Sequence, residues 1–399
     1  MTKPFVGTAA LQLVAAGRLG LDDRVSKHLP EFDNDRAREI TVRQLLTHTA
    51  GLRAYFEDLF ESEERQDALG SLREAVTEVA KEGVTRTPGE YHYSDLGSGT
   101  LAAVVAEVAG MPVEDVIAQR TVVPLALRDT HTAYRNDVPW RTRMNSTYVW
   151  KPERDDFERY WDPSRRQEVR YFEGTGGIYS TTHDYARFAW AWLHGGGLGD
   201  TRILPRELAR EALEPHVDRN PLRSYGYQWD VSESRANGLP RLFGHGGSDG
   251  TIIWVFPGTR TMVLYFTQSR GHAMRSEFGA LLADTLPEAD FIREVIPVVV
   301  REWVEACRAP AVVESAALVG RAGHYRRRGG QEIVEIQVVD GALVLHGLPD
   351  GDRLTLIPSS PTVFHGADAR VEFDLGGEGA CDLRVTRPRG DGQEFIRVP

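Results

Sequence analysis

The sequence predicts an α/β protein in two parts: an antiparallel sheet flanked by helices, followed by a small all-β module. Apolar residues recur at helical spacing in residues 5–16 and again in residues 97–109. Runs rich in β-branched and aromatic residues come later, at residues 242–244, 251–256 and 261–267. After Pro287 the composition changes, and short β runs then alternate with Gly and Asp turns. These three observations together predict the architecture.

Length and charge limit the classes of function. A chain of 399 residues with 41% apolar residues has enough material for two globular domains. Its net charge of −11 argues against nucleic-acid or anionic-membrane partners, which usually require a basic patch. The basic run Arg326-Arg327-Arg328 is interpreted as a solvated loop. We therefore expect a small-molecule function.

Targeting and metal signals are weak. No apolar run approaches the roughly 20 residues that span a bilayer, and no signal peptide is recognisable after Met1. An export signal could precede Met1, so the compartment stays open, as does the oligomeric state.

Cys307 and Cys381 form neither a disulfide framework nor a metal-type pair, and none of the 12 histidines has H-x-H or H-E-x-x-H spacing. We expect no metal site.

The first 55 residues predict two helices and a turn. Pro4 suits the first turn of a buried helix over residues 5–16, and Gly17 suits its C-terminal cap. Thr41 can cap a short helix that ends at residue 46. His48 follows, within Leu-Leu-Thr-His-Thr-Ala-Gly-Leu at residues 45–52. A catalytic role for His48 is one interpretation; the other, which we favour, is a buried polar turn whose side chains satisfy backbone groups.

The middle of the chain predicts further helices and one irregular segment. Residues 63–82 form a charged helix that Ser62 can cap, and residues 97–109 form a helix stopped by Gly110. A short helix is expected within residues 111–125. Residues 128–171 are rich in Trp, Tyr, Arg and Pro without a clear period, which is typical of a substrate-facing loop. Asp184, after Ser180-Thr181-Thr182, is interpreted as a helix-capping residue.

The last third predicts one more helix on the sheet, a helical connection and the β module. Helices are expected over residues 274–286 and 291–309. The β runs of the module are residues 333–339, 342–345, 354–357, 371–375, 383–386 and 395–398. We therefore expect a first domain over residues 1–290, a helical linker over residues 291–315, and a small β-barrel-like domain over residues 316–399.

Three short motifs carry the chemistry, and they are Met1-Thr2-Lys3, Tyr93-Ser94-Asp95 and His245-Gly246-Gly247. With the companion phrases LLTHTAGL, PGEYHYSDLG, GTGGIYSTTHDYARFA and GHGGSDGT in this order, residues 1–286 resemble the serine β-lactamase and penicillin-binding-protein family. The pattern is most similar to the branch of class C β-lactamases, D-alanyl-D-alanine carboxypeptidases and related esterases.

The resemblance implies a β-lactamase/transpeptidase-like α/β domain, an antiparallel sheet flanked by helices with a helical subdomain, followed by a lipocalin-like barrel. It also implies serine hydrolysis of a small-molecule acyl substrate, an ester, amide or β-lactam, through an acyl-enzyme and without a cofactor. A serine hydroxyl needs a neighbouring base, which Lys3 would provide as the lysine of S-x-x-K. Tyr93 would relay the proton and Asp95 would fix Tyr93 and Lys3.

The same resemblance places the third motif along the substrate. His245 would stand on the strand that lines it, and the backbone N–H of Ser248 would supply half of an oxyanion hole. Gly246 and Gly247 would let an acyl group lie close to that strand, because they have no side chain. Taken singly, Tyr93 and His245 are better explained as buried structural residues; within the ordered set of motifs we favour the functional interpretation.

The sequence departs from the family at the nucleophile. The serine of S-x-x-K would stand directly before Met1, and the chain does not contain it. Thr2 cannot replace it, since adjacent helical residues point about 100° apart. Three explanations stay open: a start assigned inside the motif, a deliberate truncation, or a noncatalytic pseudoenzyme that binds or scaffolds through the same site. We expect the chain that begins at Met1 to be inactive.

Overall fold

The computed structural model describes two units, residues 1–270 and residues 271–399. The described residues are 1–55, 69–132, 139–151, 156–164, 171–220, 223–232, 238–270, 315–339, 342–347, 354–358, 362–365, 370–375, 381–386 and 393–398. The expected helices at residues 274–286 and 291–309, the domain boundary at residue 290 and Cys307 lie outside these residues. In the described part of the chain, no helix has the length and apolar character needed to cross a bilayer.

Helix α1 (Lys3–Ala15) is the helix that the sequence predicts near its start, and residues 3–13 are all buried. A helix that is apolar on all sides must be surrounded by protein. Beyond its end, the N–H of Gly17 donates to the carbonyl oxygen of Val14, and the N–H of Arg18 donates to that of Leu13. Gly17 has a φ of +66°, a value that glycine adopts without strain.

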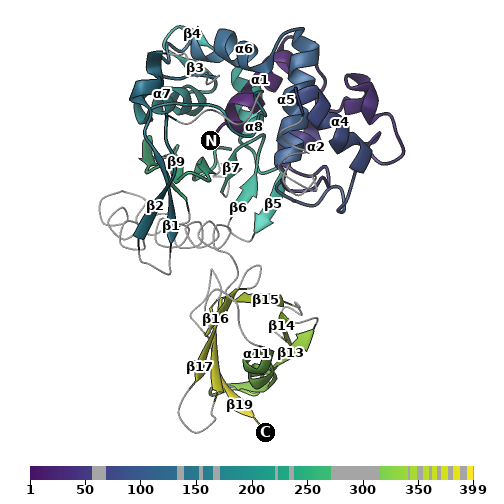
Figure 1. The fold of residues 1–399 in the computed structure, drawn as a ribbon, viewed down its shortest axis with the longest axis vertical. Helices are drawn as coiled ribbons and strands as arrows, with labels where there is room; N and C mark the ends of the chain where they lie inside the picture. Colours follow the sequence, from purple (N-terminus) through teal and green to yellow (C-terminus); the bar gives the residue numbers. More distant parts are fainter. Residues whose placement is uncertain are drawn as a thin grey trace. The chain divides into compact units, whose positions relative to one another are not determined.

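Together with α1, four further helices form the helical part of the first unit (Figure 1). Their bounds are α2 (Val42–Thr47), α4 (Leu72–Glu82), α5 (Asp95–Ala109) and α6 (Val113–Ile117), the last continued by a π-helical turn at Ala118–Val122. Helix α5 contacts α1, α2, α4 and α6. Thr41 caps α2, as predicted: its hydroxyl accepts from the N–H of Gln44, whose side chain accepts from the N–H of Thr41.

Two helix starts differ from the prediction. Helix α4 begins at Leu72, not at residue 63, and Ser71 rather than Ser62 caps it by accepting from the N–H of Glu74. Ser62 itself lies outside the described residues. Helix α5 begins two residues earlier than predicted, because the hydroxyl of Ser94 accepts from the N–H of Gly97 and so makes Ser94 the cap.

A six-stranded antiparallel sheet forms the other part of the first unit, in the order β10-β9-β8-β7-β6-β5. The strands are β5 (Val217–Asn220), β6 (Arg223–Tyr225), β7 (Asp230–Val231), β8 (Phe243–Gly247), β9 (Thr251–Phe256) and β10 (Thr261–Phe266). The three predicted runs are therefore neighbours in one sheet, as expected. Strand β8 continues through His245 to Gly247, so it includes the third motif.

Aromatic residues join α1 to the sheet. Helix α7 (Thr182–Leu193) contacts β10, and its Phe188 ring stacks on Phe5 of α1 with a centroid distance of 3.9 Å. On its other side, Phe188 stacks on Trp229 at 6.0 Å, next to β7. Aromatic pairs of this kind bury a large apolar area in a defined geometry. They fix the start of α1 relative to the strands.

The segment 128–171 is less irregular than predicted. It contains a short 3-10 helix at Pro139–Arg143 and the antiparallel strands β1 (Thr147–Lys151) and β2 (Asp156–Trp161), and β1 also pairs with β11 (Ser269–Arg270). Every side chain of β2 is exposed or half-buried. Because neither face of β2 is buried, its sequence lacks the alternation of polar and apolar residues that would have revealed a strand.

The remaining elements of this unit are short. They are 3-10 helices at Val25–Lys27 and Pro30–Phe32, the hairpin β3 (Gly197–Leu198) with β4 (Thr201–Arg202), and helix α8 (Arg206–Ala212).

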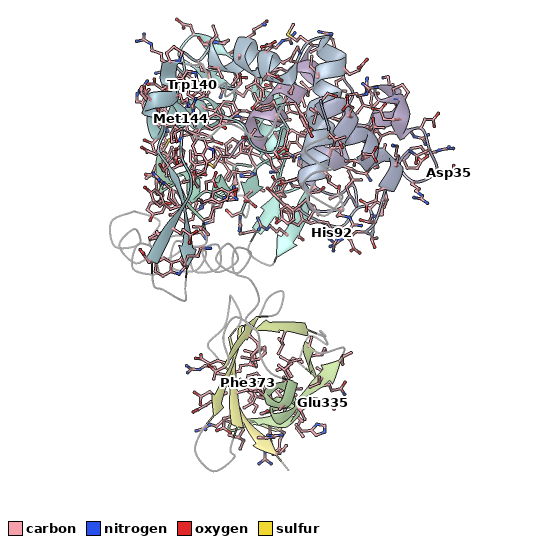
Figure 2. The ribbon with its side chains drawn as sticks, viewed as in Figure 1. Asp35, His92, Trp140, Met144, Glu335 and Phe373 are labelled. Carbon is pink, nitrogen blue, oxygen red and sulfur yellow. The ribbon has the colours of Figure 1, made fainter. Side chains whose placement is uncertain are left out.

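The described residues of the second unit form an eight-stranded antiparallel barrel and the helix α11 (Ser315–Arg321). Its strands are β12 (Gly323–Arg327), β13 (Ile333–Val339), β14 (Ala342–His346), β15 (Leu354–Pro358), β16 (Val363–His365), β17 (Arg370–Leu375), β18 (Cys381–Thr386) and β19 (Gln393–Val398). Pairing of β12 with β19 closes the barrel. Buried apolar side chains fill it, among them Tyr325, Phe364 and Phe373, the last labelled in Figure 2.

The prediction of an all-β module is confirmed, with two strands added. Sequence analysis missed β12 and β16. Arg326 and Arg327 lie in β12 and only Arg328 lies in the turn beyond it, so the interpretation of this basic run as a loop was wrong. Arg326 is exposed, and Arg327 is half-buried on the face of Tyr325 at the end of the strand, so two adjacent charges hid the alternation that would have revealed β12.

Candidate active site

The first two motifs meet at the ends of two helices. Lys3 is the first residue of α1, Asp95 is the first residue of α5, and Tyr93 stands two positions before Asp95. The Nζ atom of Lys3 lies 2.6 Å from Oδ1 of Asp95 and 4.9 Å from the centre of the Tyr93 ring. Lys3 is only 3% exposed. A buried ammonium requires such a carboxylate partner, so the pair fixes where Lys3 points.

The third motif adjoins the start of α1. The amino nitrogen of Met1 lies 3.3 Å from the carbonyl oxygen of Gly246 in β8. A Cβ atom on Gly247 would stand 2.4 Å from Oγ1 of Thr251 and 3.1 Å from Cγ of Met1. Only glycine therefore allows this approach at residue 247. Ser248 begins the turn after β8 and is exposed.

His245 faces the same region from β8 and is 5% exposed. Its Nδ1 lies 2.6 Å from the carbonyl oxygen of Gly246, and its Nε2 lies 3.4 Å from the hydroxyl of Tyr225. A carbonyl oxygen only accepts, so Nδ1 carries the proton and Nε2 accepts from Tyr225. Burial, and then the positive charges of the Met1 amine and Lys3, hold the pKa of His245 well below its ordinary value. The imidazole is neutral at pH 7.

Tyr93 keeps its phenolic proton at neutral pH. Burial, and then the negative charge of Asp95, raise the pKa of Tyr93 well above its ordinary value. The centre of its ring lies 4.7 Å from the centre of the His48 imidazole, and the centre of the Tyr225 ring lies 4.8 Å from the same imidazole. The site thus places a protonated phenol, an ammonium and a neutral imidazole around the start of α1.

The companion phrase at residues 174–189 supports the start of α1. The hydroxyl of Tyr185 donates to the carbonyl oxygen of Met1 at 2.8 Å, and the N–H of Ile178 donates to Oγ1 of Thr2 at 3.3 Å. Gly174 has a φ of +78°, and a Cβ atom there would meet Cβ of Ala102 in α5 at 2.5 Å. The phrase therefore packs tightly against α5 and α1 at once.

The prediction that Asp184 caps α7 was wrong, because the capping residue is Thr181. The hydroxyl of Thr181 accepts from the N–H of Asp184 at the start of α7. The Asp184 carboxylate accepts from the N–H of Asp129 and from the hydroxyl of Thr130. These bonds occupy the carboxylate in holding a loop to the helix.

The structure adds two residues that sequence reasoning did not place at the site. Tyr225, on β6, gave no signal beyond an aromatic residue in a β run. His48 was noticed, but nothing in the sequence indicated that its ring would lie between Tyr93 and Tyr225. Within the described ranges, no group of three or more His, Cys, Asp or Glu side chains could hold a metal ion.

Comparisons with known proteins find similarity over most of the chain. The family model described as Beta-lactamase matches residues 1–284. Penicillin-binding protein 4* of Bacillus subtilis is 24% identical over 416 residues, covering 100% of this chain and 86% of its own length. Penicillin-binding protein 4 of Amycolatopsis lactamdurans is 27% identical over 347 residues, covering 83% and 84%. The solved structure of EstCE1, a hydrolase with promiscuous acyltransferase activity, has a TM-score of 0.58 at 24% identity, covering 73% of this chain and 82% of that one.

Proposed function

Because the chain belongs to the β-lactamase family of serine hydrolases and penicillin-binding-protein-like proteins, we propose that the side chains around Lys3 form an acylation centre. The residues that we assign to it are Lys3, Tyr93, Asp95 and His245, with Gly246, Gly247 and Ser248 along the acyl group. The substrate is a small acyl compound, an ester, an amide or a β-lactam. The acyltransferase activity of EstCE1 and the names of the penicillin-binding relatives support this range.

The observation that carries the proposal is the position of the Met1 nitrogen. It lies 3.3 Å from the carbonyl oxygen of Gly246 in β8, at the start of the helix that carries Lys3. A serine directly before Met1 would be bonded to that nitrogen, so it would stand at the start of α1 and beside β8. We assign the nucleophile to that position.

The proposed chemistry is acyl transfer through serine. As the serine oxygen attacks the acyl carbon, Tyr93 accepts the serine proton and passes its own proton to the leaving group, whose bond to the acyl carbon breaks, so the protonation of the Lys3–Tyr93 pair does not change. Water then attacks the acyl-enzyme, giving one proton to Tyr93 while Tyr93 passes its own to the serine oxygen. The N–H groups of the serine and of Ser248 stabilise the oxyanion. Tyr93 suits the relay because it holds its proton at neutral pH.

Two chains that differ in one residue test this proposal. One has an N-terminal extension in which serine directly precedes Met1, and the other has alanine there. With a chromogenic ester and a chromogenic cephalosporin, we expect a covalent acyl adduct by mass spectrometry, and turnover, only with serine. Equal turnover of the two chains would contradict the assignment of the nucleophile. No adduct in either chain would favour the noncatalytic role in binding or scaffolding.

We also propose that the second unit is a lipocalin-like barrel. Its eight strands pair in the order of the sequence and close through β12 and β19, which is the up-and-down arrangement of that class. Its buried side chains fill the barrel as a packed core.

A further inference from the structure

His48 holds both chain neighbours of Tyr93. The N–H of His92, labelled in Figure 2, donates to the carbonyl oxygen of His48 at 2.8 Å. The N–H of Ser94 donates to Nδ1 of the His48 ring at 3.3 Å. One residue thus bonds the chain immediately before and immediately after Tyr93. No other side chain accepts from a backbone N–H next to Tyr93 in the bonds of the described residues.

The backbone around His48 is shaped for this contact. His48 ends α2 in the left-handed region with a φ of +57°, while its N–H donates to the carbonyl oxygen of Gln44. A non-glycine residue adopts this conformation at some cost in energy, and Asn, Asp and His adopt it most readily. The left-handed turn ends the helix and directs both acceptors of His48, the carbonyl oxygen and Nδ1, toward residues 92–94.

The His48 ring also contacts two groups of the site. It packs at 4.7 Å against Tyr93 and at 4.8 Å against Tyr225, and the hydroxyl of Tyr225 contacts His245. His48 is 2% exposed. One buried ring therefore packs against both Tyr93 and the Tyr225–His245 pair.

The imidazole of His48 is neutral at pH 7. Burial is the main cause that lowers its pKa well below the ordinary value, and the positive charge of Lys3 acts in the same direction. Because Nδ1 accepts from Ser94, the single ring proton is on Nε2. The ring is neutral and its Nδ1 already accepts from Ser94, so it can hold residues 92–94 in place. No described contact makes it part of the proton relay.

We propose that His48 is a positioning residue for Tyr93, acting through the Nδ1 bond to Ser94 and through ring contact. Its effect on catalysis rests on the proposed function, whereas its effect on the Tyr93 ring does not. If His48 only satisfied the N–H of Ser94, removing that acceptor would leave the titration of Tyr93 unchanged, so the two roles can be separated experimentally.

The test compares His48→Asn with His48→Gly. Both residues tolerate a positive φ, and both keep the carbonyl acceptor for His92. Asparagine also supplies a side-chain oxygen close to the place of Nδ1, while glycine supplies none. If His48→Gly does not fold, His48→Ala makes the same deletion at a cost of about 1–2 kcal/mol for the left-handed conformation. Circular dichroism establishes that each variant is folded.

The first readout is independent of activity. The chain beginning at Met1 is labelled with ¹³Cζ-tyrosine, and the Tyr93 resonance is assigned by its loss in Tyr93→Phe. Loss of the imidazole ring changes the Tyr93 shift in both variants, so the titration point is the readout. We expect His48→Asn to keep the high titration point of Tyr93 and His48→Gly to titrate closer to the ordinary value near pH 10. An unchanged titration point in a folded His48→Gly variant would overturn the proposal.

The second readout uses the chain in which serine precedes Met1. We expect kcat to fall at least about tenfold in His48→Gly with KM nearly unchanged, and to recover substantially in His48→Asn, because small displacements of a proton relay are costly. Equal loss in both variants would contradict positioning through Nδ1. If the parent serine chain itself forms no adduct, the proposed function fails, while the Tyr93 resonance still decides the role of His48.

Discussion

Lys3 and Asp95 form a short ion pair, 2.6 Å between Nζ and Oδ1, that joins the first residue of α1 to the first residue of α5. The side chain of Lys3 is 4% exposed and that of Asp95 is 23% exposed. The positive end of the α5 dipole also favours a carboxylate at this place. The pair therefore links two helices that are far apart in sequence, and it does so at the proposed site.

Replacement of Asp95 tests the pair directly. Asp95→Asn removes the charge and leaves Lys3 buried without its carboxylate, so we expect the free energy of unfolding to fall by about 2 kcal/mol. Urea denaturation measures the change. Glu39→Gln is the control, because Glu39 pairs with Arg24 at a similar 2.7 Å but both side chains are exposed. An exposed pair contributes less than about 1 kcal/mol, so similar losses in both variants would contradict a special role for Asp95.

The close approach of β8 to Met1 predicts intolerance at residue 247. Gly247→Ala would place a methyl group 2.4 Å from Oγ1 of Thr251 and 3.1 Å from Cγ of Met1, so we expect a loss of about 1–3 kcal/mol. Hydrogen exchange should also accelerate at the amides of Phe5 and Val6, which donate to the carbonyl oxygen of Thr2. Gly176→Ala is the matched control, since a Cβ atom there meets nothing within 4 Å. Comparable destabilisation by the two alanines would show that the contact is not tight.

The two buried histidines predict a pH dependence of stability. The pKa values of His48 and His245 are both lowered in the folded protein, mainly by burial, whereas the unfolded chain binds protons near pH 6.5. The unfolded state therefore binds more protons below pH 6.5, and the free energy of unfolding falls as the pH falls from about 7.5 to 5.5. The limiting slope is about 1.4 kcal/mol per pH unit for each histidine.

Urea titrations across that range measure this slope, and most carboxylates stay ionised there. His245→Gln should remove the contribution of one imidazole and flatten the curve. A slope that His245→Gln leaves unchanged would mean that His245 takes up a proton equally in both states.

Tyr225 and Tyr227 allow a matched comparison of site and scaffold. Both rings are buried, but the hydroxyl of Tyr225 contacts Nε2 of His245, whereas that of Tyr227 donates to Glu211 at 2.9 Å. In the serine-bearing chain we expect Tyr225→Phe to lower kcat by about three- to tenfold, the effect of about 1 kcal/mol. Tyr227→Phe should lower the thermal midpoint of unfolding and leave kcat nearly unchanged. A fall in kcat in Tyr227→Phe but not in Tyr225→Phe would contradict a role of Tyr225 in the site.

Periodicity and turn residues predicted the elements whose apolar side chains are buried. Helix α1, the strands β8 to β10 and most barrel strands were visible because burial forces apolar residues into a fixed spacing. Strand β2 and the start of α4 were not visible, the first because its side chains are exposed or half-buried and the second because a local serine cap decides a helix end. Exposed strands and the exact residue that caps a helix are therefore difficult to predict from the spacing of apolar residues.

By itself the sequence determined the two-part α/β and all-β architecture and the motif residues Lys3, Tyr93, Asp95 and His245. The family resemblance implied that Asp95 fixes Lys3. Only the tertiary structure decided that Nζ of Lys3 lies 2.6 Å from Oδ1 of Asp95, that Met1 lies against β8, and that the His48 ring lies next to both Tyr93 and Tyr225. The physical reason is that spacing along a chain fixes which face of one element a side chain occupies. Contacts between elements depend on how those faces pack, and packing involves residues that no single stretch of sequence contains.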